Sequence, residues 1–148
     1  MTVAQIGDIS MGYELHGPED GQPVLLLGGT SMPRGVWALM QLPALVEAGY
    51  RVAALDARGS GESSAPQGPY TIAQLADDAA ALMAHLGWSE ARMMGLSQGG
   101  FVVEELMAQR PELVHQDAGF GRLRHAFLLV LILAFIFLRG RPAGEIGV

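Results

Sequence analysis

The order of short apolar runs and helical patterns constrains the fold of this chain most strongly. Apolar runs at residues 24–27, 51–56 and 91–95 each lead into a loop, and each loop leads into a segment with apolar residues at helical spacing. Short runs of this kind suit strands that are buried on both faces of a parallel sheet. Connections that contain a helix place successive strands parallel, with helices on both faces. The sequence therefore predicts an α/β fold built on a mostly parallel sheet.

Turn and cap residues set the predicted boundaries of these elements. A strand is expected over residues 9–16, ahead of the first apolar run. Pro43 should kink or break the first helix, because proline lacks a backbone donor. Thr71 and Gln74 have capping-box spacing, which indicates the start of the second helix. The expected helices cover residues 36–48, 72–86 and 99–109.

Composition excludes several classes of partner and site. The 148 residues suffice for one domain with a core, and the net charge of −6 argues against nucleic acid as the main partner. The chain has no cysteine, and its four histidines are scattered, so neither a metal site nor a cofactor is expected. The first residues lack a basic region followed by an apolar one, so no signal peptide is expected and the predicted location is the cytoplasm.

The segment Gly95-Leu96-Ser97-Gln98-Gly99 carries the strongest chemical signal. It fits the pattern G-x-S-x-G and lies between an apolar run and the third helical segment. A strand-to-helix turn this tight strains its central residue and exposes that side chain at the carboxyl edge of the sheet. The flanking glycines let the two backbones pass close together. The pattern predicts Ser97 as a nucleophile; the alternative is a serine that caps a helix.

Three motifs in this order resemble the α/β-hydrolase superfamily over residues 9–114. They are Leu25-Leu26-Leu27-Gly28-Gly29-Thr30, Asp56-Ala57-Arg58-Gly59-Ser60-Gly61-Glu62-Ser63 and the Ser97 elbow. The second matches the family's D-x-R-G-x-G-x-S loop. The first resembles its apolar strand and His-Gly-x loop, although Gly28 stands where histidine is usual. The resemblance implies an incomplete α/β-hydrolase fold, with residues 1–114 as its N-terminal part and residues 115–148 as a divergent tail.

The resemblance also implies roles for individual residues. Acyl transfer builds negative charge on a carbonyl oxygen, which backbone N–H groups stabilise. The implied oxyanion donors are the N–H groups of Thr30 and Gln98. We expect structural roles for Gly95, Gly99, Asp56, Arg58, Gly59 and Gly61: Asp56 would accept hydrogen bonds from the loop after it, and Arg58 would anchor that loop. Trp37 and Met32 are expected either to line an acyl pocket or to pack in the core.

No general base or orienting acid can be assigned. In this family both partners follow the serine in the chain. His115 lies about 18 residues after Ser97, beyond a helix that rises about 1.5 Å per residue, and is therefore expected at the far edge of the sheet. His85 and His125 are expected at the same far edge, and His16 is expected in an early turn. A serine without its base should be a crippled nucleophile.

The character of the sequence changes near His115. Residues 1–114 contain 13 acidic residues and 5 arginines, whereas residues 115–148 contain 2 and 4. Residues 126–138 are all apolar, a run shorter than the roughly 20 residues of a membrane-spanning helix, which suits a buried element or contact with a membrane surface. Loss of the reading frame near residues 115–117 would explain the change, and a natural short variant is the rival hypothesis.

Two functional readings follow. The first is a cofactor-free serine hydrolase of ester, lactone or similar small acyl substrates. The second is a non-catalytic relic, truncated or frameshifted, with membrane association through residues 126–138. The oligomeric state is not predicted.

Overall fold

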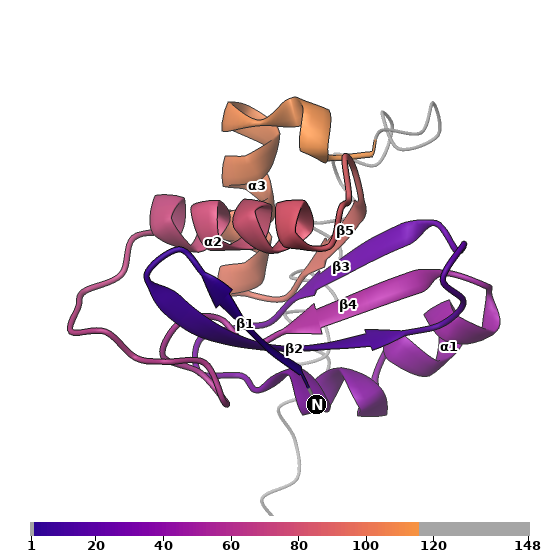
Figure 1. The fold of residues 1–148 in the computed structure, drawn as a ribbon, viewed down its shortest axis with the longest axis horizontal. Helices are drawn as coiled ribbons and strands as arrows, with labels where there is room; N and C mark the ends of the chain where they lie inside the picture. Colours follow the sequence, from indigo (N-terminus) through magenta and orange to yellow (C-terminus); the bar gives the residue numbers. More distant parts are fainter. Residues whose placement is uncertain (1, 116–148) are drawn as a thin grey trace, which may run out of the picture. The chain divides into compact units, whose positions relative to one another are not determined.

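A five-stranded mixed sheet organises residues 2–115, the part of the chain that the computed structural model describes. Its strand order is β1-β2-β4-β3-β5 (Figure 1). The strands are β1 (Thr2–Ile6), β2 (Ile9–His16), β3 (Pro23–Leu27), β4 (Arg51–Leu55) and β5 (Arg92–Gly95). Strand β3 pairs parallel with β4 and β5, whereas β2 pairs antiparallel with β1 and β4.

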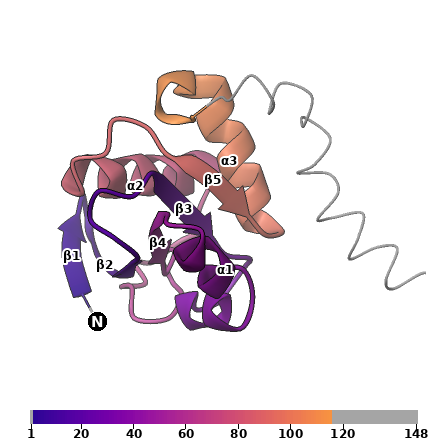
Figure 2. The same ribbon diagram turned by 90° about the vertical axis from the view of Figure 1, so that its right-hand side faces the viewer.

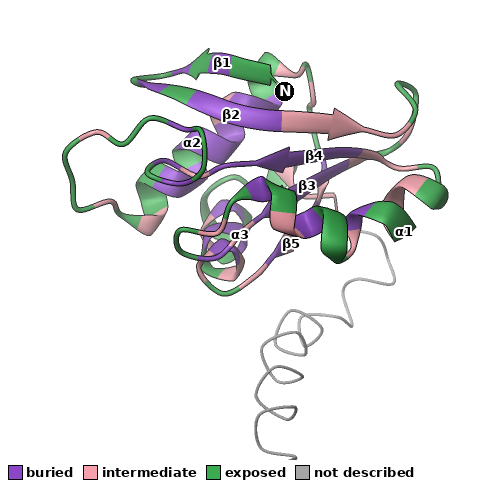
Figure 3. Cartoon of the chain, turned by 90° about the horizontal axis from the view of Figure 1, so that it is seen from below, coloured by how far each residue is buried: buried purple, intermediate pink, exposed green. Residues whose placement is uncertain are grey.

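Helices cover both faces of this sheet, which confirms the predicted α/β class. The helices are η1 (Arg34–Leu39), α1 (Leu42–Glu47), α2 (Ile72–His85), α3 (Gln98–Gln109) and η2 (Pro111–Leu113). Helix α1 lies on one face, and α2 and α3 lie on the other (Figures 1 and 2). The neighbouring residues Leu25 and Leu26 point to opposite faces and are both fully buried, as Figure 3 shows for the central strands.

Strand β1 is an element that the sequence reasoning missed. Ile6 pairs with Ile9 across a two-residue loop, Gly7-Asp8, in which Gly7 has φ +56°. Glycine at the first position of a two-residue loop is a known hairpin signal. The edge strand is only half buried, so its apolar alternation is weak. It extends the sheet by an antiparallel hairpin, and the sheet is mixed because β2 also runs antiparallel to β4.

The first helix also differs from its prediction over 36–48. The structure has two short pieces, η1 and α1, separated at Met40 and Gln41, and Pro43 lies in the first turn of the second piece. Proline fits a first turn because the N–H groups there have no intrahelical partner. The break thus falls before the proline rather than at it.

The second helix begins as predicted. The Gln74 N–H donates to Thr71 Oγ1 at 3.1 Å, and the Thr71 N–H donates to Gln74 Oε1 at 3.0 Å, so the capping box is confirmed. Within residues 2–115 no helix has the length and apolar character to cross a membrane. The predicted tail, its apolar run 126–138 and His125 lie outside the described residues, and the domain boundary at 114 stays a prediction.

Candidate active site

Ser97 occupies a strained turn between β5 and α3. Its backbone has φ +53° and ψ −116°, and its side chain is exposed. A serine with positive φ is uncommon and indicates a backbone held by its surroundings. A Cβ atom on Gly95 would overlap the carbonyl of Gly99, and one on Gly99 would overlap that of Leu27. The two glycines are therefore required by close backbone approach.

A second turn lies beside this elbow. The Met32 N–H donates to the carbonyl of Gly29 at 3.1 Å, and Ser31, the third residue of the turn, has φ +56°. This geometry is of the type II kind, in which the N–H of the second residue, Thr30, points out of the turn. A Cβ on Gly29 would lie 3.5 Å from the Cβ of Ser97. The turn and the elbow are therefore in contact.

The N–H groups of Thr30 and Gln98 belong to these two turns. Gln98 is the first residue of α3, where an N–H has no intrahelical acceptor. Among the contacts within residues 2–115, neither the Thr30 N–H nor the Gln98 N–H donates a hydrogen bond. The geometry is compatible with an oxyanion hole, and the assignment of these donors stays a prediction.

Asp56 is fully buried at the carboxyl end of β4. Its carboxylate accepts hydrogen bonds from the N–H of Arg34 at 2.6 Å, from the Arg34 guanidinium and from the N–H of Glu62 at 3.0 Å. Its carbonyl accepts from Ser63 Oγ at 2.6 Å. A Cβ on Gly61 would overlap the Asp56 carboxyl group. Asp56 thus ties two loops together, and both of its carboxylate oxygens are engaged.

Arg58 anchors the same loop to the other side of the structure. It binds Asp78 of α2 with two hydrogen bonds, at 2.6 and 2.7 Å, and reaches Asp8 at 2.9 Å. The hydrogen bonds to Asp78, opposed by burial, raise the pKa of the Arg58 guanidinium above its usual range. The centroid of the Tyr70 ring lies 5.7 Å from Arg58 Cζ, and the same ring fills the space beside Gly59. Arg58 therefore holds the loop through charge and packing together.

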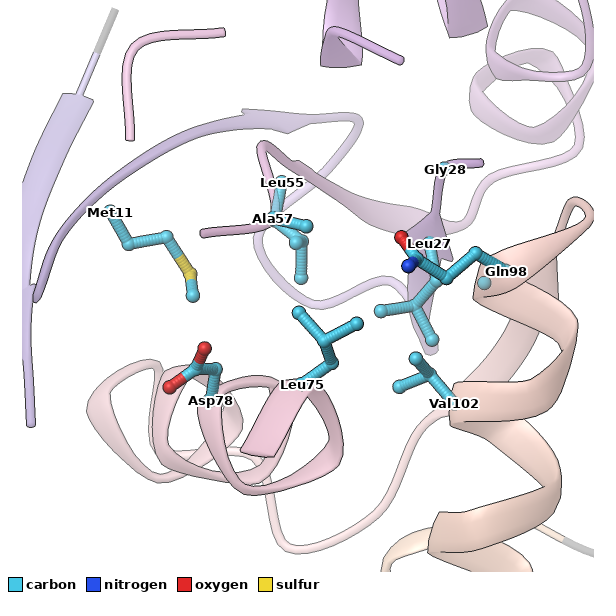
Figure 4. Close-up of a pocket in the computed structure, with 10 residues that line it drawn as sticks. Met11, Leu27, Gly28, Leu55, Ala57, Leu75, Asp78, Gln98 and Val102 are labelled. Atoms are coloured by element: carbon cyan, nitrogen blue, oxygen red, sulfur yellow. The ribbon is translucent and has the colours of Figure 1, made fainter. Parts of the chain in front are cut away.

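A small crevice, partly open to solvent, lies beside the first turn of α3. Its apolar lining comes from β2, β3, β4 and both long helices, namely Met11, Leu27, Leu55, Leu75 and Val102. Asp78 and Gln98 lie on opposite sides of it (Figure 4), and both carboxylate oxygens of Asp78 bind Arg58. Gln98 and Gly99 belong to both the elbow and the crevice, so the crevice adjoins the candidate nucleophile.

A family model described as alpha/beta hydrolase fold matches residues 22–116, which include both turns and the Asp56 loop. The chain belongs to the α/β-hydrolase fold family. The resemblance stated from the three motifs is thereby confirmed.

Named relatives of this hydrolase-family chain are enzymes of several kinds. A candidate non-heme bromoperoxidase, BpoC of Mycobacterium tuberculosis, is 37% identical over 121 residues, which are 80% of this chain and 45% of that protein. The 3-oxoadipate enol-lactonase 2 of Acinetobacter baylyi is 33% identical over 74% of this chain and 40% of its own. The solved enol-lactonase from Burkholderia xenovorans LB400 has a TM-score of 0.74 and 32% identity over 77% of this chain and 44% of its own. This chain spans less than half the length of these relatives.

Trp37 packs in the core instead of lining the crevice. It is 1% exposed and contacts the cluster that contains Val24, Leu26 and Val52, on the face covered by α1. Met32 is partly buried and packs against the same cluster. Of the two alternatives left open for these residues, the structure favours packing.

The histidines of the described residues lie away from the elbow. His16 pairs with Val52 at the amino end of β4, and the His115 N–H donates to Ala91 just before β5 begins. His85 lies about two turns beyond Asp78 on α2, and its Nε2 is 3.4 Å from the hydroxyl of Tyr13. Ser97 lies at the carboxyl edge, so none of these three is placed to act as its base. Within residues 2–115 there is also no group of three or more side chains that could hold a metal ion.

Arg34 is the site residue that sequence reasoning overlooked. It is 8% exposed and forms ion pairs with Asp56, Glu62 and Glu14. Its partners lie 20 to 28 residues away in the sequence, so no local spacing indicates them. The only available signal was a lone arginine within an otherwise uncharged loop.

Proposed function

We propose that this chain carries the nucleophile and oxyanion hole of a serine hydrolase for esters, lactones or similar small acyl substrates. The strained, exposed backbone of Ser97 between β5 and α3 supports this proposal most directly. The hydroxyl attacks the acyl carbon, the N–H groups of Thr30 and Gln98 stabilise the oxyanion, and water releases the acyl group. The relatives named as enol-lactonases favour a small acyl substrate.

The same geometry supports slow turnover by this chain. None of the three described histidines is placed beside Ser97, and both oxygens of Asp56 are already engaged by the loops. An oxyanion hole and binding alone retain roughly 10³–10⁴ of acceleration over water. We therefore propose a reactive but crippled serine site.

A fluorophosphonate probe and p-nitrophenyl acetate test this function together. We expect covalent labelling and weak acetate hydrolysis by the full chain, and loss of both in Ser97→Ala. The matched control is Ser89→Ala, which changes another exposed serine at the opposite end of β5. Labelling that persists in Ser97→Ala would contradict the assigned nucleophile. Absence of labelling in the unmodified chain would favour the non-catalytic alternative.

Turnover near that of a complete hydrolase would contradict the crippled site instead. It would mean that a base reaches Ser97 from outside the described residues or from a second subunit. Loss of labelling in Ser97→Ala identifies the serine that reacts, whereas the rates of labelling and turnover report how far a base activates it.

A further inference from the structure

The loop that carries Thr30 is held at both ends. At its start, the Leu96 N–H donates to the carbonyl of Leu27 at 3.0 Å, which joins the end of β3 to the elbow. At its other end, the Arg34 N–H donates to Asp56 at 2.6 Å. Strands β3 and β4 are parallel neighbours, so Thr30 and Asp56 both follow the carboxyl ends of adjacent strands.

The Arg34 side chain makes further contacts at the C-terminal end of this loop. Its guanidinium binds Asp56 and Glu62, and its Nε lies 3.2 Å from a carboxylate oxygen of Glu14. Asp56 is fully buried, and a buried carboxylate that lost its cationic partner would be strongly destabilised. Because the buried Asp56 carboxylate needs a cationic partner, the Arg34 side chain is held beside it.

Packing leaves little room for this cluster to shift. A Cβ atom on Gly12 would lie 3.1 Å from an Asp56 oxygen and 3.2 Å from an Arg34 nitrogen. Between Thr30 and Arg34 the chain has few soft torsions: Ser31 is held at φ +56°, and Pro33 has φ −72°. A displacement at Arg34 is therefore transmitted to the Thr30 N–H.

The geometry points to Arg34 as a positioning residue of the oxyanion hole. It acts through the loop, by clamping residues 30–34 onto Asp56 so that the Thr30 N–H faces the oxygen of a bound acyl group. This inference rests on the proposed function of Ser97 and Thr30, and it deepens that function. Misplacement of a catalytic group by about 1 Å can lower the reaction rate by up to about a hundredfold.

Phenylboronic acid tests the inference without needing a general base. The Ser97 oxygen adds to the trigonal boron, the hydroxyl proton leaves to solvent, and the resulting tetrahedral anion places an oxygen in the oxyanion hole. Boron-11 NMR on the full chain reports the tetrahedral species, and titration gives its affinity. We expect Arg34→Lys to weaken this affinity about tenfold to a hundredfold, because lysine keeps the charge but cannot bridge Asp56 and Glu62.

Arg58→Lys is the matched control. Arg58 is as buried as Arg34 and is also paired with carboxylates, but it ties the loop after β4 to Asp78 and Asp8. A purely structural effect would change thermal unfolding in both variants, whereas the boronate affinity should fall only in Arg34→Lys. If Arg34→Lys does not fold, Glu62→Gln replaces it and should show a smaller loss, because the Asp56 contacts remain.

The outcomes separate this inference from the function on which it rests. If Arg34→Lys folds and binds the boronate with wild-type affinity, the positioning role of Arg34 is overturned and the proposed function stands. Where Glu62→Gln is used instead, wild-type affinity in that variant has the same meaning. An equal loss in Arg58→Lys does the same. Absence of a tetrahedral species in the unmodified chain, or its persistence in Ser97→Ala, overturns the proposed function and the inference together.

Discussion

Two serines carry the backbone strain of the described residues. Apart from glycines, only Ser31 and Ser97 have positive φ within residues 2–115, and their turns are in contact next to Gly29. Each such residue costs of order 1–3 kcal/mol and persists only where the surroundings impose it. Close backbone approach at Gly95 and Gly99 holds the elbow, and we propose that the contacts of Arg34 with Asp56 hold the second turn. In the proposed oxyanion hole, strain at both turns would present N–H groups beside the Ser97 hydroxyl.

The Thr30 donor can be tested by removing its N–H alone. Proline is favoured at the second position of a type II turn, so Thr30→Pro keeps the turn and removes the donor. We expect the rate of Ser97 phosphonylation by the fluorophosphonate, which releases fluoride, to fall about 10²–10³-fold, the usual cost of one oxyanion donor. Thr30→Ala keeps the N–H and should label at nearly the wild-type rate. Equal rates in the two variants would remove Thr30 from the oxyanion hole.

At the scale of elements, local patterns predicted most of the fold. Strands β2 to β5 and helices α2 and α3 were found within one or two residues, because their apolar periodicity and caps are local signals. Strand β1 was missed, since an exposed edge strand buries few side chains. The Ser97 elbow was predictable because its glycines are close in sequence. The contacts of Arg34 were not predictable, because its partners lie in β2 and in the loop after β4, far from it in the sequence.

The elbow depends on how closely α3 approaches β3, and two adjacent glycines test this. A Cβ on Gly99 would overlap the carbonyls of Leu27 and Gly28, whereas the nearest atom to a Cβ on Gly100 is 3.9 Å away. We expect Gly99→Ala to lower the free energy of unfolding by about 1–3 kcal/mol through overpacking. Gly100→Ala should raise it by up to about 1 kcal/mol, because alanine favours the helix.

Urea unfolding followed by tryptophan fluorescence measures both free energies. The Gly100 variant controls for the change from glycine to alanine within the first turn of the same helix. If both variants changed stability in the same direction by similar amounts, close backbone approach would not be the reason for Gly99.

At the scale of the whole molecule, the charged side chains form two groups: buried ion pairs, and exposed carboxylates that repel one another. Arg34 and Arg58 are buried and together pair with five carboxylates. Most other acidic side chains of residues 2–115 are exposed, and the whole chain carries a net charge of −6. Buried pairs are screened little by salt, whereas exposed like charges are screened strongly. The two populations should therefore respond differently to ionic strength.

Salt should stabilise the chain for this reason. Raising NaCl from about 0.02 to 0.3 M shortens the Debye length from roughly 20 to 6 Å, which weakens repulsion between surface carboxylates but leaves the two arginine clusters nearly unchanged. We expect the midpoint of thermal unfolding, followed by circular dichroism, to rise by a few degrees. Choline chloride at the same ionic strength should give the same rise, since screening does not depend on the cation. In Arg58→Lys the rise should persist from a lower starting midpoint. A midpoint that fell with salt would mean that exposed ion pairs such as Arg110 with Asp77 outweigh surface repulsion, contrary to the small contribution expected of exposed pairs.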